Sequence, residues 1–274
     1  IVALRMHHDT CFWSGYRQQL SSMPAAVLSA WDKTIPHYGN LLGMVAFGLE
    51  ELGLYSVAES YGREATAQNP NDLWAVHAVA HVMEMQQRSK DGIGWLDYTL
   101  DHFRDFNPFR GHIWWHKGLF LIDAGLFDAA LSLYDDAIHD TESAFFLDIQ
   151  NSVSFLARLE FNGVNIGQRW DELAEVAQEN SDGHALVFTD LHQIIALCRA
   201  ERFDAAAAHI ASMQNFAATQ KSHIAAVIRD VGAPIGQSIL AHETGDHDAA
   251  LDLMMAHRIF IPRLGASNAQ RDLL

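Results

Sequence analysis

Apolar residues recur along most of the chain at intervals of three and four, and short turns rich in glycine or polar residues separate these segments. This spacing is typical of helices that bury one face. In the clearest unit, residues 46–52 form an apolar segment that is followed by Gly53, an aromatic residue at Tyr55 and a small residue at Ala58. The unit ends at Asn69–Pro70. The pattern predicts two helices that are joined by a glycine turn, cross closely and stop at the proline.

The same unit returns around Gly125, 72 residues after Gly53, which is about two repeats of the ~34-residue tetratricopeptide length. Between them, a weaker pair of helices is predicted over 74–85 and 92–103, with a polar turn at 86–91. Further pairs are predicted over 148–174, with Gly163 at the turn, over 191–206, and over 235–250, with Gly245 at the turn. We therefore predict an all-α fold, a tetratricopeptide-like right-handed superhelix (α-solenoid) of about six helical hairpins, as one repeat domain over residues 1–274.

Small residues recur where the two helices of a hairpin should cross. One hairpin alone leaves an apolar stripe in water, and burying that stripe at ~25 cal/mol per Å² requires a neighbouring hairpin. Enlarging one of these small residues should therefore cost ~1–3 kcal/mol. The positions are Ala58, Ala130, Ala206 and Ala250.

Composition supports the helical prediction, and the net charge disfavours one class of binding partner. The chain has 274 residues, 49% of them hydrophobic, and only 6 prolines, and it lacks the alternating β-branched segments of strands. It begins at Ile1 in the middle of the pattern, so we expect it to be the later part of a longer protein. With 34 acidic and 18 basic residues, the net charge of -16 disfavours binding to nucleic acid.

The same charge disfavours an anionic membrane surface, and the longest apolar run, 41–49, is shorter than the ~20 residues that a spanning helix needs. We therefore expect no membrane partner. Cys11 and Cys198 are far apart and form no Cys-x-x-Cys motif, so the sequence predicts neither a disulfide framework nor a thiolate zinc site. A cytoplasmic location is the simplest expectation, and a homo-oligomer is possible.

Four strings resemble the tetratricopeptide repeat protein 38 family and together span nearly the whole chain. They are GMVAFGLEE at 43–51, HAVAHVMEM at 77–85, HIWWH at 112–116 and LGASNAQRD at 264–272. The chain departs from the family pattern at Ala266, where a second glycine is common, and at Asn268, where a histidine is common. The resemblance implies a tetratricopeptide-like fold, but it implies no particular reaction.

The candidate chemistry lies on two of the predicted helices. His77 and His81 are four residues apart and Glu84 follows three residues later, so on a helix all three project from one face. His112 and His116 repeat this spacing one hairpin later. By the resemblance, the first helix of each hairpin lines the concave groove of the superhelix, which places these side chains on the groove wall. Trp74 and Trp115 lie on the same two helices.

Three interpretations of this cluster stay open. In the first, the imidazoles fill polar niches between stacked helices. In the second, they form a recognition pocket with Glu84, Trp74, Trp115 and Phe120. This pocket would extend to Asp148, Asn151 and His192, and Arg271 would fold back to meet an anionic ligand group. In the third, the cluster is a metal or acid/base site, because two histidines four apart on a helix can both bind zinc.

We therefore expect the chain to bind a small molecule or short peptide in the groove, with no cofactor or metal assigned. The alternatives are an enzyme that uses His81, Glu84 and His116 as catalytic groups, and a pure interaction scaffold. Three other features favour plain structural roles. Cys198 is predicted to be a buried inert thiol, the Gly232/Gly236 spacing lacks the strand of a phosphate loop, and Asp97, Asp101 and Asp105 are predicted to form a solvated face.

Overall fold

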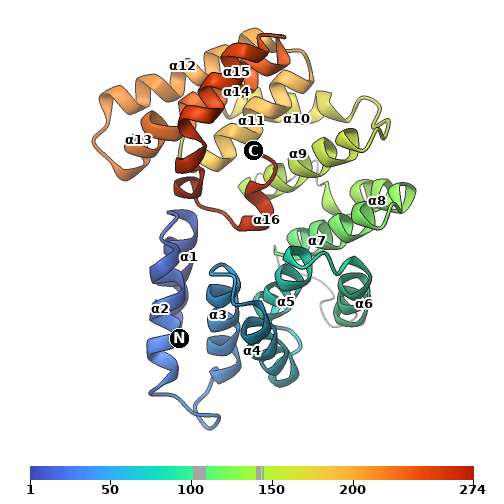
Figure 1. Ribbon diagram of the computed structural model, residues 1–274, viewed down its shortest axis with the longest axis vertical. Helices are drawn as coiled ribbons and strands as arrows, with labels where there is room; N and C mark the ends of the chain where they lie inside the picture. Colours follow the sequence, from blue (N-terminus) through green and yellow to red (C-terminus); the bar gives the residue numbers. More distant parts are fainter. Residues whose placement is uncertain (101–108, 140–142, 144) are drawn as a thin grey trace. The chain divides into compact units, whose positions relative to one another are not determined.

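The computed structural model describes residues 1–100, 109–139, 143 and 145–274 (Figure 1). Within these ranges the chain is helical and contains no strand, so the all-α prediction is confirmed. The chain divides into two compact units. Unit 1 comprises Ile1–Ile138 and Ser267–Asp272, and unit 2 comprises His139–Ala266 and Leu273–Leu274. The prediction of one continuous domain over residues 1–274 stays a prediction, and each unit is described by itself.

The helices of unit 1 are α1 (Val2–Trp13), α2 (Arg17–Leu28), α3 (Tyr38–Glu50), α4 (Tyr55–Gln68), α5 (Leu73–Met85), α6 (Ser89–Leu100), α7 (Arg110–Asp123), α8 (Phe127–Leu133), the π-helical turn η1 (Tyr134–Ile138) and α16 (Asn268–Arg271). The helices α3 to α8 lie where the sequence pattern predicts hairpins, whereas it predicts no helix at α1, α2 or α16. Helix α6 begins three residues before the predicted start at 92, and residues 101–103 of that prediction lie outside the described residues, as do Asp101 and Asp105.

The turns of unit 1 form for local reasons. Gly53, between α3 and α4, has a φ of 79°, a left-handed conformation that glycine adopts without steric cost. Its N–H donates to the carbonyl of Glu50 at 2.7 Å, which satisfies a carbonyl at the end of α3. Helix α5 begins at the N-cap residue Asp72, whose carboxylate accepts from the N–H groups of Trp74 and Ala75.

The core of unit 1 is aromatic where α1, α3 and α5 meet. Phe12, Phe47 and Trp74 pack together with Leu41 and Met44. A second cluster continues along α5, α6 and α7, where Val79, Leu96 and Phe120 are fully buried. Between them, α3 and α5 bury almost their entire surfaces, so polar residues on these two helices lie inside the protein.

Unit 2 is also helical in its described residues. Its helices are α9 (Phe146–Phe161), α10 (Arg169–Glu179), α11 (Val187–Arg199), α12 (Phe203–Thr219), α13 (His223–Val227), the π-helical turn η2 (Ile228–Gly232), α14 (Ala233–Glu243), α15 (His247–His257) and the 3-10 helix η3 (Arg258–Leu264). The predicted turns at Gly163 and Gly245 are both present, with φ of 76° and 87°. The small residues predicted at helix crossings, Ala58, Ala130, Ala206 and Ala250, are all buried.

One continuous helical run in the described part of the chain, His223–Glu243, is long and apolar enough by length and composition to cross a membrane. Half of its most apolar window is buried inside the protein, as is also found for core helices of soluble proteins. This is weak evidence for a spanning segment, and the expectation of no membrane partner stays a prediction.

Candidate metal centre

Helices α5 and α7 each contribute two histidines to one point in the interior of unit 1. Their rings are almost completely buried: His77 is 1% exposed, His112 2%, and His81 and His116 0%. The ring centroids of His77 and His81 are 4.2 Å apart, and those of His81 and His116 are 4.5 Å apart. One nitrogen from each of the four rings can be chosen so that all lie within 4.8 Å of one another. The two helical pairs predicted from the sequence therefore converge.

Three of the four rings meet through their Nε2 atoms. Nε2 of His77 lies 2.7 Å from Nε2 of His81 and 3.1 Å from Nε2 of His112. A neutral imidazole nitrogen carries either one proton or one lone pair, so it makes one good hydrogen bond and cannot serve both neighbours well. A tetrahedral zinc ion at 2.0–2.1 Å from each ligand separates ligand nitrogens by about 3.3 Å. The arrangement is therefore close to that of nitrogens around a metal ion.

Burial keeps the imidazoles of His77 and His81 neutral. It is the largest influence on the pKa of His77, which lies well below 6.5, and the neighbouring His81, His112 and His116 lower it further. Burial also lowers the pKa of His81 to about 4, although Glu51 opposes this shift. Neutral imidazoles are the form that binds a metal ion.

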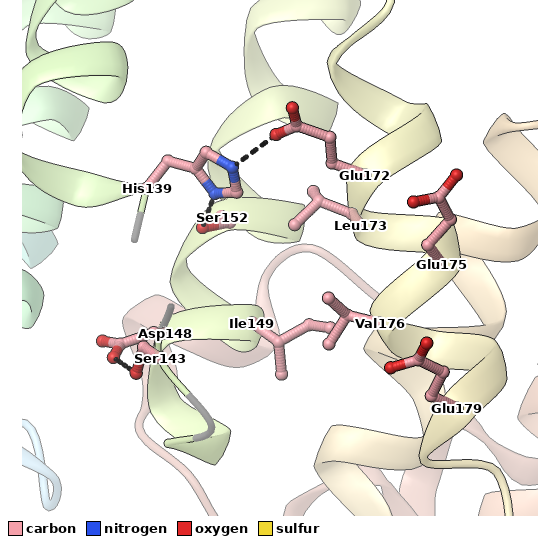
Figure 2. Close-up of a pocket in the computed structure, with 10 residues that line it drawn as sticks. All are labelled: His139, Ser143, Asp148, Ile149, Ser152, Glu172, Leu173, Glu175, Val176 and Glu179. Carbon is pink, nitrogen blue, oxygen red and sulfur yellow. Dashed lines mark hydrogen bonds and ion pairs between the residues drawn. The ribbon is translucent and has the colours of Figure 1, made fainter. Parts of the chain in front are cut away.

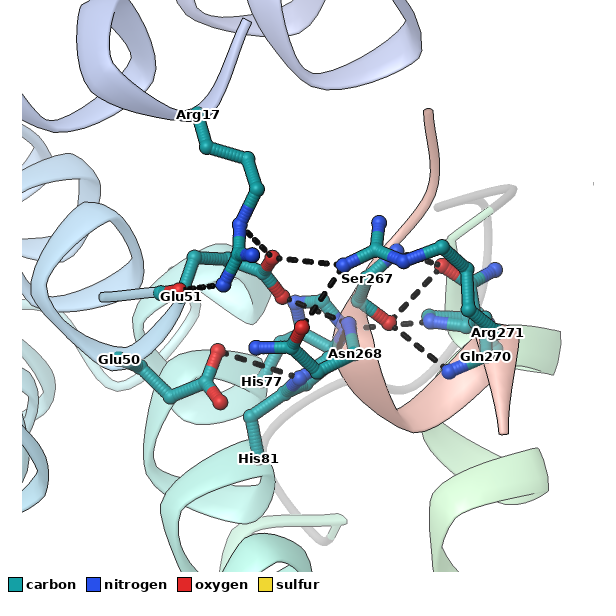
Figure 3. Close-up of polar contacts among 10 residues, drawn as sticks. Arg17, Glu50, Glu51, His77, His81, Ser267, Asn268, Gln270 and Arg271 are labelled. Atoms are coloured by element: carbon teal, nitrogen blue, oxygen red, sulfur yellow. Dashed lines mark hydrogen bonds and ion pairs between the residues drawn. The ribbon is translucent and has the colours of Figure 1, made fainter. Parts of the chain in front are cut away.

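A buried carboxyl group, that of Glu50, lies beside His81. Oε2 of Glu50, the last residue of α3, is 3.4 Å from Nδ1 of His81, the ring nitrogen that points away from the cluster (Figure 3). Glu50 is 0% exposed, and within the described residues neither of its oxygens accepts a hydrogen bond. Burial raises its pKa to about 8, against the opposing effect of Arg17 and Arg271. Metal-binding histidines commonly present their second ring nitrogen to such a carboxylate.

Glu51 is held by groups from two distant parts of the chain (Figure 3). Nη2 of Arg271 is 3.4 Å from its Oε2, the N–H of Asn268 donates to its Oε1 at 2.9 Å, and Nε of Arg17 is 3.6 Å from Oε2. Glu51, Glu50 and His81 also form a set with metal-ligand spacing. Because the two guanidinium groups already neutralise Glu51 and repel a cation, the four-histidine cluster is the better site.

Aromatic side chains hold the imidazoles in place. Phe47 stacks on His77 at 5.2 Å and Trp115 stacks on His112 at 5.0 Å. Trp74 also contacts His77, with ring centroids 5.1 Å apart. Trp74 also lines a cavity of about 300 Å³ together with Asp72 and Arg5, and the Arg5 guanidinium lies 4.0 Å from the Trp74 ring centroid.

Most of the predicted site residues of unit 1 are brought together, but they lie in the protein interior and not on the wall of an open groove. Trp74, Trp115 and the four histidines surround one point and are buried. Glu84 is half-buried, and no set of metal-ligating groups among the described residues includes it. The carboxylate beside His81 is Glu50 instead. Phe120 lies in the core against Gly92, and Arg271 does fold back, onto Glu51.

Asp148, Asn151 and His192, predicted to extend the pocket, belong to unit 2. Asp148 lines a cavity of about 310 Å³ with His139 and the carboxylates of Glu172, Glu175 and Glu179 (Figure 2). His192 is 1% exposed, and its Nδ1 donates to the carbonyl of Phe188 at 2.7 Å. Asn151 is buried as well. Cys198 is buried with its pKa raised to about 12, chiefly by burial, which agrees with the predicted inert thiol.

Sequence reasoning missed Glu50, Glu51 and Arg17 as parts of the site. Glu50 carried a local signal, because it follows Phe47 by three residues and so lies on the buried face of an otherwise apolar helix. Arg17 carried no such local signal, because its ion pair with Glu51 depends on how α2 packs against α3.

No protein-family model matches the chain. The resemblance to the tetratricopeptide repeat protein 38 family therefore rests on the four sequence strings and stays a prediction.

Proposed function

We propose that this chain binds a divalent transition-metal ion at the four-histidine cluster of unit 1. One observation carries the proposal: four buried imidazoles from α5 and α7 present ring nitrogens within 4.8 Å of one another. Lone histidines buried for packing reasons usually find separate backbone or carboxylate partners, as His192 does. Here Nε2 of His77 faces two other imidazole nitrogens, and a metal ion would accept lone pairs from all of them.

The donor set favours particular ions. Imidazole ligands suit zinc, copper, iron and nickel, whereas calcium and magnesium prefer oxygen ligands. Zinc has no redox chemistry and accepts tetrahedral coordination, so it is the reference ion for a test. Glu50 would hold the ring of His81 in the orientation that points Nε2 at the ion.

Four protein ligands close a coordination shell, which is the arrangement of a structural site. An ion here would link α5 to α7, and hence two successive hairpins of unit 1. A catalytic role would require one imidazole to give way to a water or substrate, and His116 and His81 would then be the groups nearest the reaction.

A second candidate function is the binding of a small molecule in the cavity beside Trp74. The cavity, of about 300 Å³, favours it because one wall, Trp74, directly contacts His77 of the cluster. Arg5 and Asp72 supply charged groups at the same cavity, which resembles an apolar pocket with a few polar anchors.

We also propose that the hairpins stack as a tetratricopeptide-like superhelix. Support comes from the helix–turn–helix pairs α3–α4 and α7–α8, each with a left-handed glycine at its turn, and from the buried alanines at the predicted crossings. Such stacking explains how two successive first helices, α5 and α7, bring their histidines face to face.

Metal analysis of the purified chain tests the main proposal. We expect one equivalent of zinc or another transition metal per chain, lost on treatment with a chelator and restored by Zn²⁺. His77→Ala should abolish binding, because the ring of His77 contacts the other three imidazoles. His192→Ala is the matched control, since it removes an equally buried histidine of unit 2 and should keep the metal. Absence of stoichiometric metal, together with no effect of Zn²⁺ on thermal unfolding, would overturn the proposal.

The cavity is tested separately by thermal-shift screening of small metabolites against wild type and Trp74→Phe. Saturation at ~100 times the Kd should add ~2.7 kcal/mol of stability. A ligand that stabilises both proteins equally would show that the cavity beside Trp74 is not where it binds.

A further inference from the structure

Unit 2 contains a second buried polar cluster, which has no part in the metal centre. It consists of His184 in the segment before α11, Asp190 on α11, and His209 and Ser212 on α12. Oγ of Ser212 is 2.9 Å from Nε2 of His184, and Nδ1 of the same ring is 2.9 Å from Oδ1 of Asp190. Serine, histidine and aspartate are thus joined in series through the two nitrogens of one imidazole.

The chemistry of the groups fixes the direction of these hydrogen bonds. A carboxylate oxygen accepts, so Nδ1 of His184 is the protonated nitrogen and donates to Asp190. In the neutral ring Nε2 then carries the lone pair and accepts from the hydroxyl of Ser212. A hydroxyl that donates to an imidazole held by a carboxylate has the connectivity of an activated serine nucleophile.

Asp190 is held in this orientation from a second side. Nε2 of His209 lies 3.0 Å from the same oxygen, Oδ1, that accepts from His184. Asp190 and His209 are 3% and 0% exposed, so both hydrogen bonds form away from water. Two donors fix the carboxylate, and through it the tautomer and orientation of the His184 ring.

The base is buried, but the serine residue is partly exposed. His184 is 4% exposed, whereas Ser212 is half-buried and its helix neighbours Ala208 and Ala211 are exposed and small. His184 has a φ of 38°, a left-handed conformation in which histidine, asparagine and aspartate are enriched among the residues other than glycine.

We propose that Ser212 is a nucleophile activated by His184 and Asp190, and that unit 2 hydrolyses small carboxylic esters. Oγ of Ser212 bonds to the ester carbonyl carbon while its proton passes to Nε2 of His184. The carbon–oxygen bond to the alcohol then breaks, and the alcohol leaves with that proton. Water next attacks the acyl group on Ser212 with His184 again as base, releasing the carboxylic acid and restoring the hydroxyl.

The surroundings limit the substrate class. Ala208, Ala211 and Phe216, whose ring lies 5.6 Å from that of His184, present a small and largely apolar surface. The chain's net charge of -16 disfavours anionic substrates, so neutral or cationic esters are expected. Asn215, exposed three residues further along α12, carries an amide of the kind that stabilises the developing oxyanion.

A fluorophosphonate probe and p-nitrophenyl acetate, applied to the purified full chain, test this proposal. We expect the probe to label Ser212, located by mass spectrometry of the digested protein. Ser212→Ala should abolish labelling and ester turnover, and Asp190→Asn should slow both by at least about tenfold. His184→Ala should slow labelling by about a hundredfold or more, the usual contribution of a general base.

Two control variants separate reactivity from structure. Ser222→Ala removes an exposed serine of unit 2 that has no imidazole at its hydroxyl, and it should leave labelling unchanged. His209→Gln removes one hydrogen bond to Asp190 but keeps the series from Asp190 to Ser212, so it should retain most labelling. Absence of labelling at Ser212 in folded wild-type protein, or labelling that is unaffected by His184→Ala, would show a purely structural hydrogen-bond chain. Loss of metal does not enter this test, so its result is independent of the four-histidine cluster.

Discussion

At the scale of the residue, contact distances decide which positions tolerate change. The i, i+4 spacing of His77 and His81 places both rings on one face of α5, but only the packing of α5 against α7 and α3 turns that face inward. The same holds for Glu50, whose neighbours make it a buried carboxylate beside an imidazole instead of a solvated helix-end charge.

Gly48 and Gly94 provide a matched pair of residue-scale predictions. A Cβ at Gly48 on α3 would lie 2.6 Å from Cα of Ser21, which is backbone of α2 and cannot move aside cheaply. Gly48→Ala should therefore destabilise the protein by ~1–3 kcal/mol in urea unfolding. A Cβ at Gly94 on α6 meets no atom within 4 Å, so Gly94→Ala should stabilise by ~0.5–1 kcal/mol through the backbone entropy of the unfolded chain. Equal effects at the two sites would contradict this account of the α2–α3 contact.

At the scale of the element, the short helix α16 is held to α3. Its capping box at Ser267 and Gln270 shapes it locally, and Arg271 and Asn268 attach it to Glu51. The side chains of Arg271 and Glu51 are 6% and 1% exposed, so removing Arg271 leaves the buried carboxylate of Glu51 with Arg17, at 3.6 Å, as its remaining cationic partner.

Arg271→Ala should consequently destabilise unit 1 by ~3–5 kcal/mol. Arg263→Ala is the control, because it breaks the Arg263–Asp230 ion pair of unit 2. The side chains of that pair are 37% and 40% exposed, so its loss should lower the free energy of unfolding by less than about 1 kcal/mol. Chemical denaturation of both variants beside wild type measures the difference. If Arg271→Ala unfolds no more easily than Arg263→Ala, α16 is not fixed through Glu51.

At the scale of the whole molecule, buried neutral histidines in both units link stability to pH. Burial lowers the pKa of His8 to about 3 and that of His192 to about 4, from 6.5. Between those values and 6.5 the unfolded chain binds protons that the folded chain does not. The contribution of these two histidines to the free energy of unfolding is therefore fully present above about pH 6.5 and is lost as the pH falls through this window.

We expect the free energy of unfolding to fall between pH 7 and pH 5 by up to ~1.4 kcal/mol per pH unit for each such histidine. Urea unfolding at the two pH values measures it. His192→Gln should reduce the difference, whereas His247→Gln should not, because His247 is exposed in the folded protein as well. A difference of the same size in all three proteins would exclude His192 as a source.

Metal binding gives a further whole-molecule prediction. An ion that binds only the folded state, at ~100 times its Kd, should raise the free energy of unfolding by ~2.7 kcal/mol. Thermal unfolding with and without Zn²⁺ after chelator treatment measures this, and His112→Ala should remove most of the shift. Stabilisation of His112→Ala equal to that of wild type would place the bound zinc elsewhere in the protein.

The sequence by itself determined the helical hairpins between residues 38 and 250, because helix periodicity, glycine turns and caps act over fewer than ten residues. It also determined that each of α5 and α7 carries two histidines on one face. The turns at Gly53, Gly125, Gly163 and Gly245 and the buried alanines could all be predicted on these local grounds.

Only the tertiary structure decided which side chains meet. Glu50 lies 31 positions before His81 in the chain and Asn268 lies 217 positions after Glu51, so no local pattern links them. The His184–Asp190–Ser212 series combines a loop and two helices in the same way. Such contacts depend on how whole helices pack, and helix packing is set by the summed burial of many side chains, which no short stretch of sequence contains.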